Sequence, residues 1–92
     1  MTFSKVDQNQ NEIKNALISK GCKIISLASL RNGKPDLLVC YKQRLILFEI
    51  KSAKGKLTKD EQKFFDDWLS ECGINLFIVR NVDQALEIIE SF

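Results

Sequence analysis

The sequence predicts an α/β fold in which a helix, three strands, a helix, a strand and a helix follow one another (αβββαβα). Two short apolar runs, 37–41 and 45–50, are separated only by a short polar step, which is typical of a β-hairpin. Three other segments have apolar residues at helical spacing, and a glycine follows two of them where a helix should end. A last apolar run, 75–79, lies between two of these helices, so we expect it to join the same sheet in parallel. The expected result is a mixed four-stranded sheet flanked by helices.

The first third of the chain is predicted to contain one helix and one strand. Residues from about 10 to 20 form the helix, because Ile13 and Leu17 lie on one face of it. The apolar residues that follow predict a short strand over 23–29. The segment 31–35 ends in a proline, which disfavours helix and predicts a loop leading into the hairpin.

The hairpin has one credible turn, at Lys42 and Gln43. A turn centred between these two residues places Asp36 directly opposite Glu49. Residues two apart on a strand share a face, so Lys51 projects beside Glu49. The pairing depends on the register, because a slip of one residue would turn Asp36 to the other face. Lys-Gln is an unfavourable pair for a two-residue turn, and a four-residue loop would preserve the same pairing.

The second half of the chain begins with a basic loop and a capping box, Thr58 to Glu61, that opens the second helix. This helix is expected to run to about Cys72. Its apolar face contains two residues that we expect to pack in the core, Phe65 and Trp68. A closing helix is predicted from the spacing of four further apolar residues: Val82, Ala85, Leu86 and Ile89.

The composition is that of one ordinary folded domain, which we expect to span residues 1–92. No apolar run is long enough to span a membrane, and the first residues lack the apolar core of a signal peptide, so an intracellular location is expected. The three cysteines lack metal-site spacing and are expected to be free thiols. The chain has no histidine, which excludes imidazole bases and histidine-ligated zinc. Any catalysis must therefore use carboxylates, lysine and a metal.

Asp36 and Glu49 form the centre of the candidate site. Two carboxylates directly opposite each other on a sheet are destabilising unless a positive charge lies between them. A divalent cation would supply that charge, and carboxylate oxygens are ligands that suit Mg²⁺ or Mn²⁺. Because Mg²⁺ leaves positions to water and substrate phosphates, a phosphate is the natural substrate group. A simpler interpretation is a surface hairpin in which Lys51 neutralises Glu49 and Asp36 caps a turn.

The distribution of charge indicates a polyanion as the partner. The segment 20–59 carries a net charge of +8 and the remainder of the chain −6, although the whole chain carries only +2. The two acids within this basic segment are the ones that the hairpin brings together. Basic residues near them are therefore candidates for contacts to DNA phosphates: Arg31, Lys34, Lys54, Lys56 and Lys59. The alternative interpretation is a lysine-rich surface that faces solvent.

Two further polar residues are candidates for supporting roles. Glu12 lies at the edge of the apolar face of the first helix, where it either faces solvent or reaches toward Asp36 and Glu49. Gln62 lies in the first turn of the second helix and is by default a surface residue. If Gln62 faces the sheet, its amide could donate a hydrogen bond to a water or a phosphate.

These motifs, taken in chain order, resemble those of the PD-(D/E)xK nuclease superfamily. The set comprises Glu12, Gly33-Lys34-Pro35-Asp36, Glu49-Ile50-Lys51 and, after a basic loop, Gln62. The size and the Gly-x-Pro-Asp-Leu phrase are most similar to the virus-type replication-repair nuclease family (VRR-NUC), over about residues 10 to 80. The resemblance implies a single restriction-endonuclease-like domain, in the cytoplasm of a bacterium or of a virus-infected cell.

The resemblance also implies a role for each site residue. The implied metal ligands are Asp36, Glu49 and the backbone carbonyl of Ile50. Lys51 would orient water or stabilise charge, and the implied supporting residues are Glu12 and Gln62. From the parts alone, Mg²⁺, or Mn²⁺ as a substitute, would activate a water for in-line hydrolysis of a phosphodiester.

The leading hypothesis is a metal-dependent DNA endonuclease that acts as a homodimer on branched DNA such as four-way (Holliday) junctions. The small size of the chain favours association with a second copy, and a two-fold dimer would present two sites to symmetric DNA. Two alternatives stay open. One is a DNA-binding or assembly module without catalysis, and the other is a nuclease for flap or ordinary duplex DNA.

Overall fold

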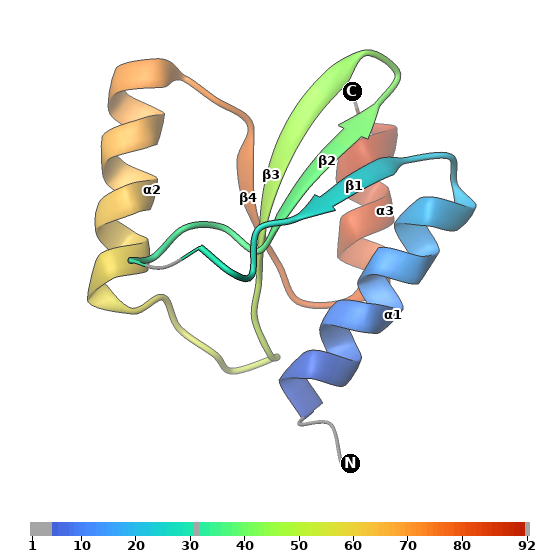
Figure 1. The fold of residues 1–92 in the computed structure, drawn as a ribbon, viewed down its shortest axis with the longest axis horizontal. Helices are drawn as coiled ribbons and strands as arrows, with labels where there is room; N and C mark the ends of the chain where they lie inside the picture. Colours follow the sequence, from blue (N-terminus) through green and yellow to red (C-terminus); the bar gives the residue numbers. More distant parts are fainter. Residues whose placement is uncertain (1–4, 31, 92) are drawn as a thin grey trace.

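The chain forms its elements in the predicted order, as the computed structural model of residues 5–30 and 32–91 shows (Figure 1). The bounds of the helices and strands are α1 (Lys5–Ser19), β1 (Lys23–Ser26), β2 (Leu37–Tyr41), β3 (Arg44–Ile50), α2 (Lys59–Cys72), β4 (Leu76–Val79) and α3 (Val82–Glu90). The predicted α/β fold of order αβββαβα is confirmed. The first helix begins earlier, and the first strand ends earlier, than the sequence pattern indicates.

The four strands form one mixed sheet in the order β1-β2-β3-β4. The pairs β1–β2 and β2–β3 are antiparallel, and β4 is parallel to β3. Leu37 lies opposite Phe48 and Tyr41 lies opposite Arg44, so the predicted register of the hairpin is confirmed. This register directs buried Leu37 and Phe48 to the same face, whereas a slip of one residue would expose one of them.

The hairpin turn consists of two residues that both have left-handed backbone conformations. The φ angles are 49° at Lys42 and 68° at Gln43. A two-residue turn of this kind matches the twist of the flanking strands, and it normally contains asparagine or glycine. Because lysine and glutamine are unfavourable in this turn, we infer that the apolar faces of β2 and β3, and not the turn, maintain the register.

The hydrophobic core lies on one face of the sheet, between the strands and two helices. α1 and α3 lie side by side on this face, and α2 lies on the other side of the sheet (Figure 1). Ile13 and Leu17 of α1 and Ile89 of α3 are fully buried, as their spacing predicts. They contact the inward-facing residues of the central strands: Leu37, Val39, Ile46, Phe48 and Ile50.

α2 does not pack into the core, and the expectation that Phe65 and Trp68 do so is wrong. No residue of α2 is buried, and Trp68 is 41% exposed. An apolar groove of about 440 Å³ separates the helix from the outer face of the sheet, with Phe64 and Trp68 on one side and Leu45 and Leu47 on the other. Helical spacing predicts that a helix has an apolar face, but it does not show whether the same chain covers that face.

The three cysteines are free thiols, as expected. Cys22 is buried, whereas Cys72 at the end of α2 is exposed. Within the part of the chain that the structure describes, no helix combines the length and apolarity needed to cross a membrane.

Candidate active site

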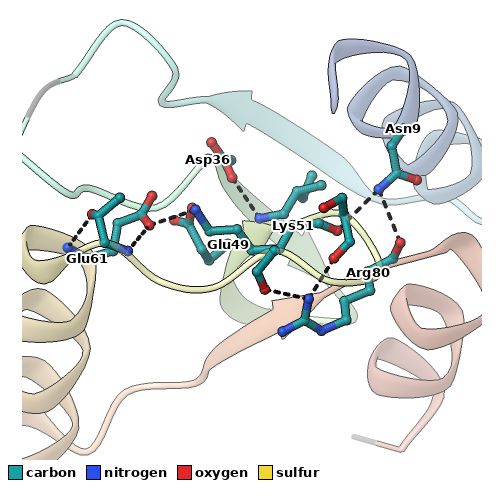
Figure 2. A network of polar contacts seen from close by, with 10 residues as sticks. Asn9, Asp36, Glu49, Lys51, Glu61 and Arg80 are labelled. Carbon is teal, nitrogen blue, oxygen red and sulfur yellow. Dashed lines mark hydrogen bonds and ion pairs between the residues drawn. The ribbon is translucent and has the colours of Figure 1, made fainter. Parts of the chain in front are cut away.

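Asp36 is held at the end of the hairpin by two hydrogen bonds to β3. Its backbone N–H donates to the carbonyl of Phe48 at 2.9 Å. Its carboxylate Oδ2 accepts the backbone N–H of Ile50 at 2.6 Å (Figure 2). One carboxylate oxygen thus takes the place of a backbone carbonyl in pairing with the strand. Burial raises the pKa of Asp36, although the hydrogen bond from Ile50 opposes that shift.

Glu49 is buried, and its exposed fraction is 4%. Among the residues that the structure describes, it is the one polar or charged residue that is buried. It lies in β3 between Phe48 and Ile50, which are also buried. Burial first, then the charge of Asp36 and contacts with Glu61, raise the pKa of Glu49 to about 9. At neutral pH the isolated site therefore favours a proton on Glu49, and a cation bound there would displace it.

Lys51 makes its shorter ion pair with Glu61 and not with Glu49. Its Nζ lies 2.6 Å from Oε1 of Glu61 and 3.8 Å from Oε1 of Glu49 (Figure 2). The simpler interpretation of the sequence, in which Lys51 neutralises Glu49, requires the ammonium to lie closer to Glu49 than to Glu61. Because the ammonium is bonded to Glu61, the carboxylate of Glu49 is left for another positive charge.

Glu61 is a site residue that the sequence pattern did not identify. It is the third residue of α2, and its Oε1 accepts the backbone N–H of Thr58 at 2.8 Å. In return Thr58 Oγ1 accepts the N–H of Glu61, so the predicted capping box is confirmed. Partial burial acts to raise the pKa of Glu61, but the hydrogen bonds from Lys51 and Thr58 hold it below its ordinary value. The capping box in the sequence indicated where α2 begins, but it did not indicate that Glu61 contacts Lys51.

Two residues from distant parts of the chain hold the loop that follows Lys51. Arg80, directly after β4, donates from Nη1 to the carbonyls of Ser52 at 2.6 Å and Gly55 at 2.8 Å. Asn9 of α1 donates from Nδ2 to the carbonyl of Arg80 at 3.1 Å and, at 3.4 Å, to that of Lys51 (Figure 2). Because their partners are backbone carbonyls, no sequence motif could have marked these two residues.

The loop before Asp36 contacts the start of α2 at Gly33. Gly33 has a φ of +77°, which favours glycine, and a Cβ there would lie 2.6 Å from the backbone nitrogen of Glu61. The same Cβ would overlap the backbone of Asp60. The absence of a side chain at Gly33 therefore allows the Asp36 loop to lie against the helical turn that carries Glu61.

The two predicted supporting residues lie apart from this cluster. Glu12 is exposed on α1, and no hydrogen bond or ion pair found within the described ranges joins it to Asp36 or Glu49. Gln62 is exposed on α2, where its Nε2 donates to Oδ1 of Asp66 at 2.9 Å. Supporting roles for Glu12 and Gln62 stay predictions.

The predicted DNA-contacting lysines that the structure describes are exposed on the segments around the site. Lys34 lies in the loop before Asp36, Lys54 and Lys56 lie in the loop between β3 and α2, and Lys59 is the first residue of α2. The Nζ of Lys34 lies 5.6 Å from the centre of the Phe64 ring. Arg31 lies outside the described residues.

The donor set suits a hard divalent cation. Asp36 and Glu49 provide carboxylate oxygens, and burial, followed by the charge of Asp36, raises the pKa of Glu49. No group of three or more Asp, Glu, His or Cys side chains in residues 5–30 and 32–91 could hold a metal. Mg²⁺ is generally held by one or two protein carboxylates, and water or substrate completes its shell. A backbone carbonyl such as that of Ile50 could contribute.

Fold and site together define a small α/β domain with a carboxylate–lysine site at the end of its two central strands. A solved structure described as "VRR_NUC domain" has the same fold, with a TM-score of 0.77 and 23% sequence identity over 98% of this chain and 99% of that one. No protein-family model matches the chain, and no curated protein matches it.

Proposed function

We propose that this protein is a metal-dependent DNA endonuclease of the VRR-NUC family. The observation that carries the proposal is the juxtaposition of buried Glu49 with Asp36 and Lys51 at the end of β3. A buried carboxylate with a pKa near 9 is unfavourable for folding, and such groups cluster at functional sites. The motif resemblance and the fold shared with the VRR_NUC structure support the same assignment.

Each residue of the site has a chemical role in this proposal. Asp36 and Glu49 would hold Mg²⁺, or Mn²⁺ as a substitute, with the Ile50 carbonyl as a further ligand. When bound, the cation supplies the positive charge that activates a water and polarises a phosphodiester. Lys51 offers an ammonium to the negative charge that develops on the phosphate oxygens. Because the chain has no histidine, the proton of the water would pass to a carboxylate or to solvent.

DNA is the proposed substrate because exposed basic residues flank the acids. Lys34 precedes Asp36 by two residues, and the lysines of the loop after β3 follow Lys51. Contacts from such lysines to phosphates provide affinity that does not depend on base sequence. The geometry of the site would then provide selectivity for the cleaved bond, and the arrangement of two sites would provide selectivity for DNA shape.

A homodimer is part of this proposal, and its interface is the apolar groove between α2 and the sheet. Leu38 and Leu45 line both this groove and a second hollow on the outer face of the sheet. The groove and the outer face therefore form one continuous apolar surface. The exposed surface of α2 beside it is acidic, with Asp66, Asp67 and Glu71. The opposite rim of the sheet is basic, with Lys23 and Lys42. We expect a second copy related by two-fold symmetry to bind here, because its acidic α2 would meet the basic rim of the first.

The dimer is tested by sedimentation of the wild type and of Leu45→Glu. Leu45 is 62% exposed, so its replacement should leave the monomer folded while it opposes association. We expect a dimer for the wild type, and a monomer with reduced junction cleavage for Leu45→Glu. A wild-type monomer at micromolar concentration with full junction cleavage would contradict the proposed interface.

A nuclease assay tests the chemistry. Labelled four-way junction, flap and linear duplex DNA are incubated with Mg²⁺, Mn²⁺ or EDTA and with the wild type or Glu49→Gln. The matched control is Glu87→Gln, at an exposed position of α3. We expect metal-dependent cleavage that is lost only in Glu49→Gln, and preference for the junction. Preference for flap or duplex would favour the other nuclease hypothesis. DNA binding without cleavage of any substrate would favour the binding module and refute the enzyme.

A further inference from the structure

We propose that Glu61 is a positioning residue for this reaction, which holds the ammonium of Lys51 away from Glu49 so that the carboxylate is free for the cation. The inference rests on the proposed function for its catalytic meaning, although the arrangement itself is structural. Glu61 reaches the site from α2, whereas Lys51 and Glu49 belong to the end of β3. It pairs with the ammonium of Lys51 and also contacts the side chain of Glu49.

The first step of the argument is that Glu61 has a fixed position. Its Oε1 accepts two hydrogen bonds, from the backbone N–H of Thr58 at 2.8 Å and from the ammonium of Lys51 at 2.6 Å. The side chain of Glu61 is 16% exposed, so solvent screens this pair only in part. A carboxylate that is already bonded to the helix N-terminus loses little further freedom when it binds the ammonium.

The second step concerns what Lys51 would do without this partner. Glu49 is the other carboxylate within ion-pair distance of its Nζ, at 3.8 Å. A small change of the lysine side chain would bring the two groups into hydrogen-bond contact, since the attraction between opposite charges grows as they approach in a partly buried site. Lys51 would then compete with a divalent cation for Glu49. The ion pair with Glu61 prevents that competition and keeps the ammonium beside the carboxylates.

The third step is that the turn carrying Glu61 is held against the other half of the site. Gly33 packs on the backbone of Asp60 and Glu61, three residues before Asp36. The loop of Asp36, the end of β3 and the first turn of α2 therefore meet at one place. Displacement of that turn would alter the position of the Lys51 ammonium relative to both carboxylates.

The test measures the affinity for Mg²⁺ alone, by calorimetry, in a double-mutant cycle of Glu61→Gln and Lys51→Met. Glutamine can still accept the N–H of Thr58, so the cap is retained while the charge is removed. We expect Glu61→Gln to weaken Mg²⁺ binding by about 3- to 10-fold, and its effect to be smaller in the Lys51→Met background. An effect that is equal or larger without Lys51 would mean that Glu61 acts on the cation directly, and would overturn the proposal.

Cleavage kinetics give the second measurement, with Asp60→Asn as the control. Asp60 is an exposed acid in the same helical turn, so this control changes the same charge next to the same helix end. For Glu61→Gln we expect kcat to fall by about 10- to 100-fold with KM for DNA nearly unchanged, as for a misplaced catalytic group. A kcat equal to that of Asp60→Asn would refute the role in catalysis. Wild-type protein that cuts no DNA would refute the proposed function instead, and the Mg²⁺ cycle would still test the positioning of Lys51.

Discussion

The carboxylate of Asp36 and the backbone of Ile50 are joined by a hydrogen bond of 2.6 Å, from the strand N–H to Oδ2. This bond continues the contact between the two strands past Leu37, the first residue of β2, and fixes the carboxylate next to Glu49. A proposed metal ligand is thus also part of the hairpin. The two roles can be separated by substitution, because asparagine retains a hydrogen-bond acceptor and alanine does not.

Asp36→Asn should abolish cleavage and leave the free energy of unfolding within about 1 kcal/mol of the wild type, because an amide oxygen can still accept the Ile50 N–H. Asp36→Ala should lower it by about 1 to 3 kcal/mol, because it leaves that N–H without its partner. Urea unfolding in EDTA measures both values. Equal stability of the two variants would show that the hydrogen bond contributes little.

The metal-free protein should lose stability as pH rises, because of Glu49. Its pKa is raised to about 9 in the folded state from an ordinary value of 4.5, so between these values the folded state binds more protons than the unfolded state. The free energy of unfolding should therefore fall with pH in this window, by up to about 1.4 kcal/mol per pH unit.

Urea unfolding of wild type and Glu49→Gln at several pH values, with EDTA or with excess Mg²⁺, checks this prediction. Glu49→Gln should be more stable than the wild type at pH 8 in EDTA and should show a weaker pH dependence. Mg²⁺ should stabilise the wild type more as pH rises, because it competes with the proton for the carboxylates. Parallel pH profiles of the two proteins would refute a strongly raised pKa of Glu49.

Gly33→Ala should disturb the site as well as the fold. The added Cβ would overlap the backbone of Asp60 and would occupy a left-handed conformation that alanine disfavours. We expect a loss of about 2 kcal/mol in the free energy of unfolding and weaker coupling between Lys51 and Glu61. Gly21→Ala is the control, because Gly21 also has a positive φ but has open space around its Cβ position. Equal effects would mean that backbone strain alone is responsible.

Replacement of Lys42-Gln43 by Asn-Gly should stabilise the protein. Both residues have positive φ, and asparagine and glycine adopt that conformation at lower energy. We expect a gain of about 1 kcal/mol in the free energy of unfolding, measured by urea denaturation, and unchanged affinity for Mg²⁺. A loss of stability would indicate that the contact of Lys42 with the Tyr41 ring outweighs the backbone strain.

Arg80→Lys should loosen the basic loop although the charge is kept. The guanidinium Nη1 bonds to the carbonyls of Ser52 and Gly55, and an ammonium cannot reproduce the planar geometry of those donors. We expect hydrogen exchange of the loop amides to accelerate, and DNA affinity to fall less than it does in Lys54→Ala. Unchanged exchange would show that the loop keeps its path without Arg80.

The hairpin and the helix ends were predictable because local chemistry determines them. The alternation of buried residues in β2 and β3 selected the register in which Leu37 lies opposite Phe48, and this register brings the carboxyl groups of Asp36 and Glu49 together. Thr58 and Glu61 marked the start of α2, and Gly73 marked its end. The neighbourhood of Asp36, Glu49 and Lys51 depends on one register only, so pattern reasoning was sufficient to find it.

The packing of α2 was not predictable in the same way. Its amphipathic spacing indicated a buried face, yet Trp68 and Leu69 are about two-fifths exposed beside the groove. Spacing reports which residues share a face, and the position of that face depends on the loops on both sides of the helix. A second copy of the chain is our proposal for what covers it.

By itself the sequence determined the order of the elements, the hairpin register and the pair of carboxylates with Lys51, because these follow from contacts between residues near in sequence or opposite on two strands. Only the tertiary structure decided that Lys51 pairs with Glu61, and that Asn9 and Arg80 hold the loop beside them. Those contacts join segments whose separation depends on the packing of the whole chain, and their partners include backbone carbonyls that every residue carries.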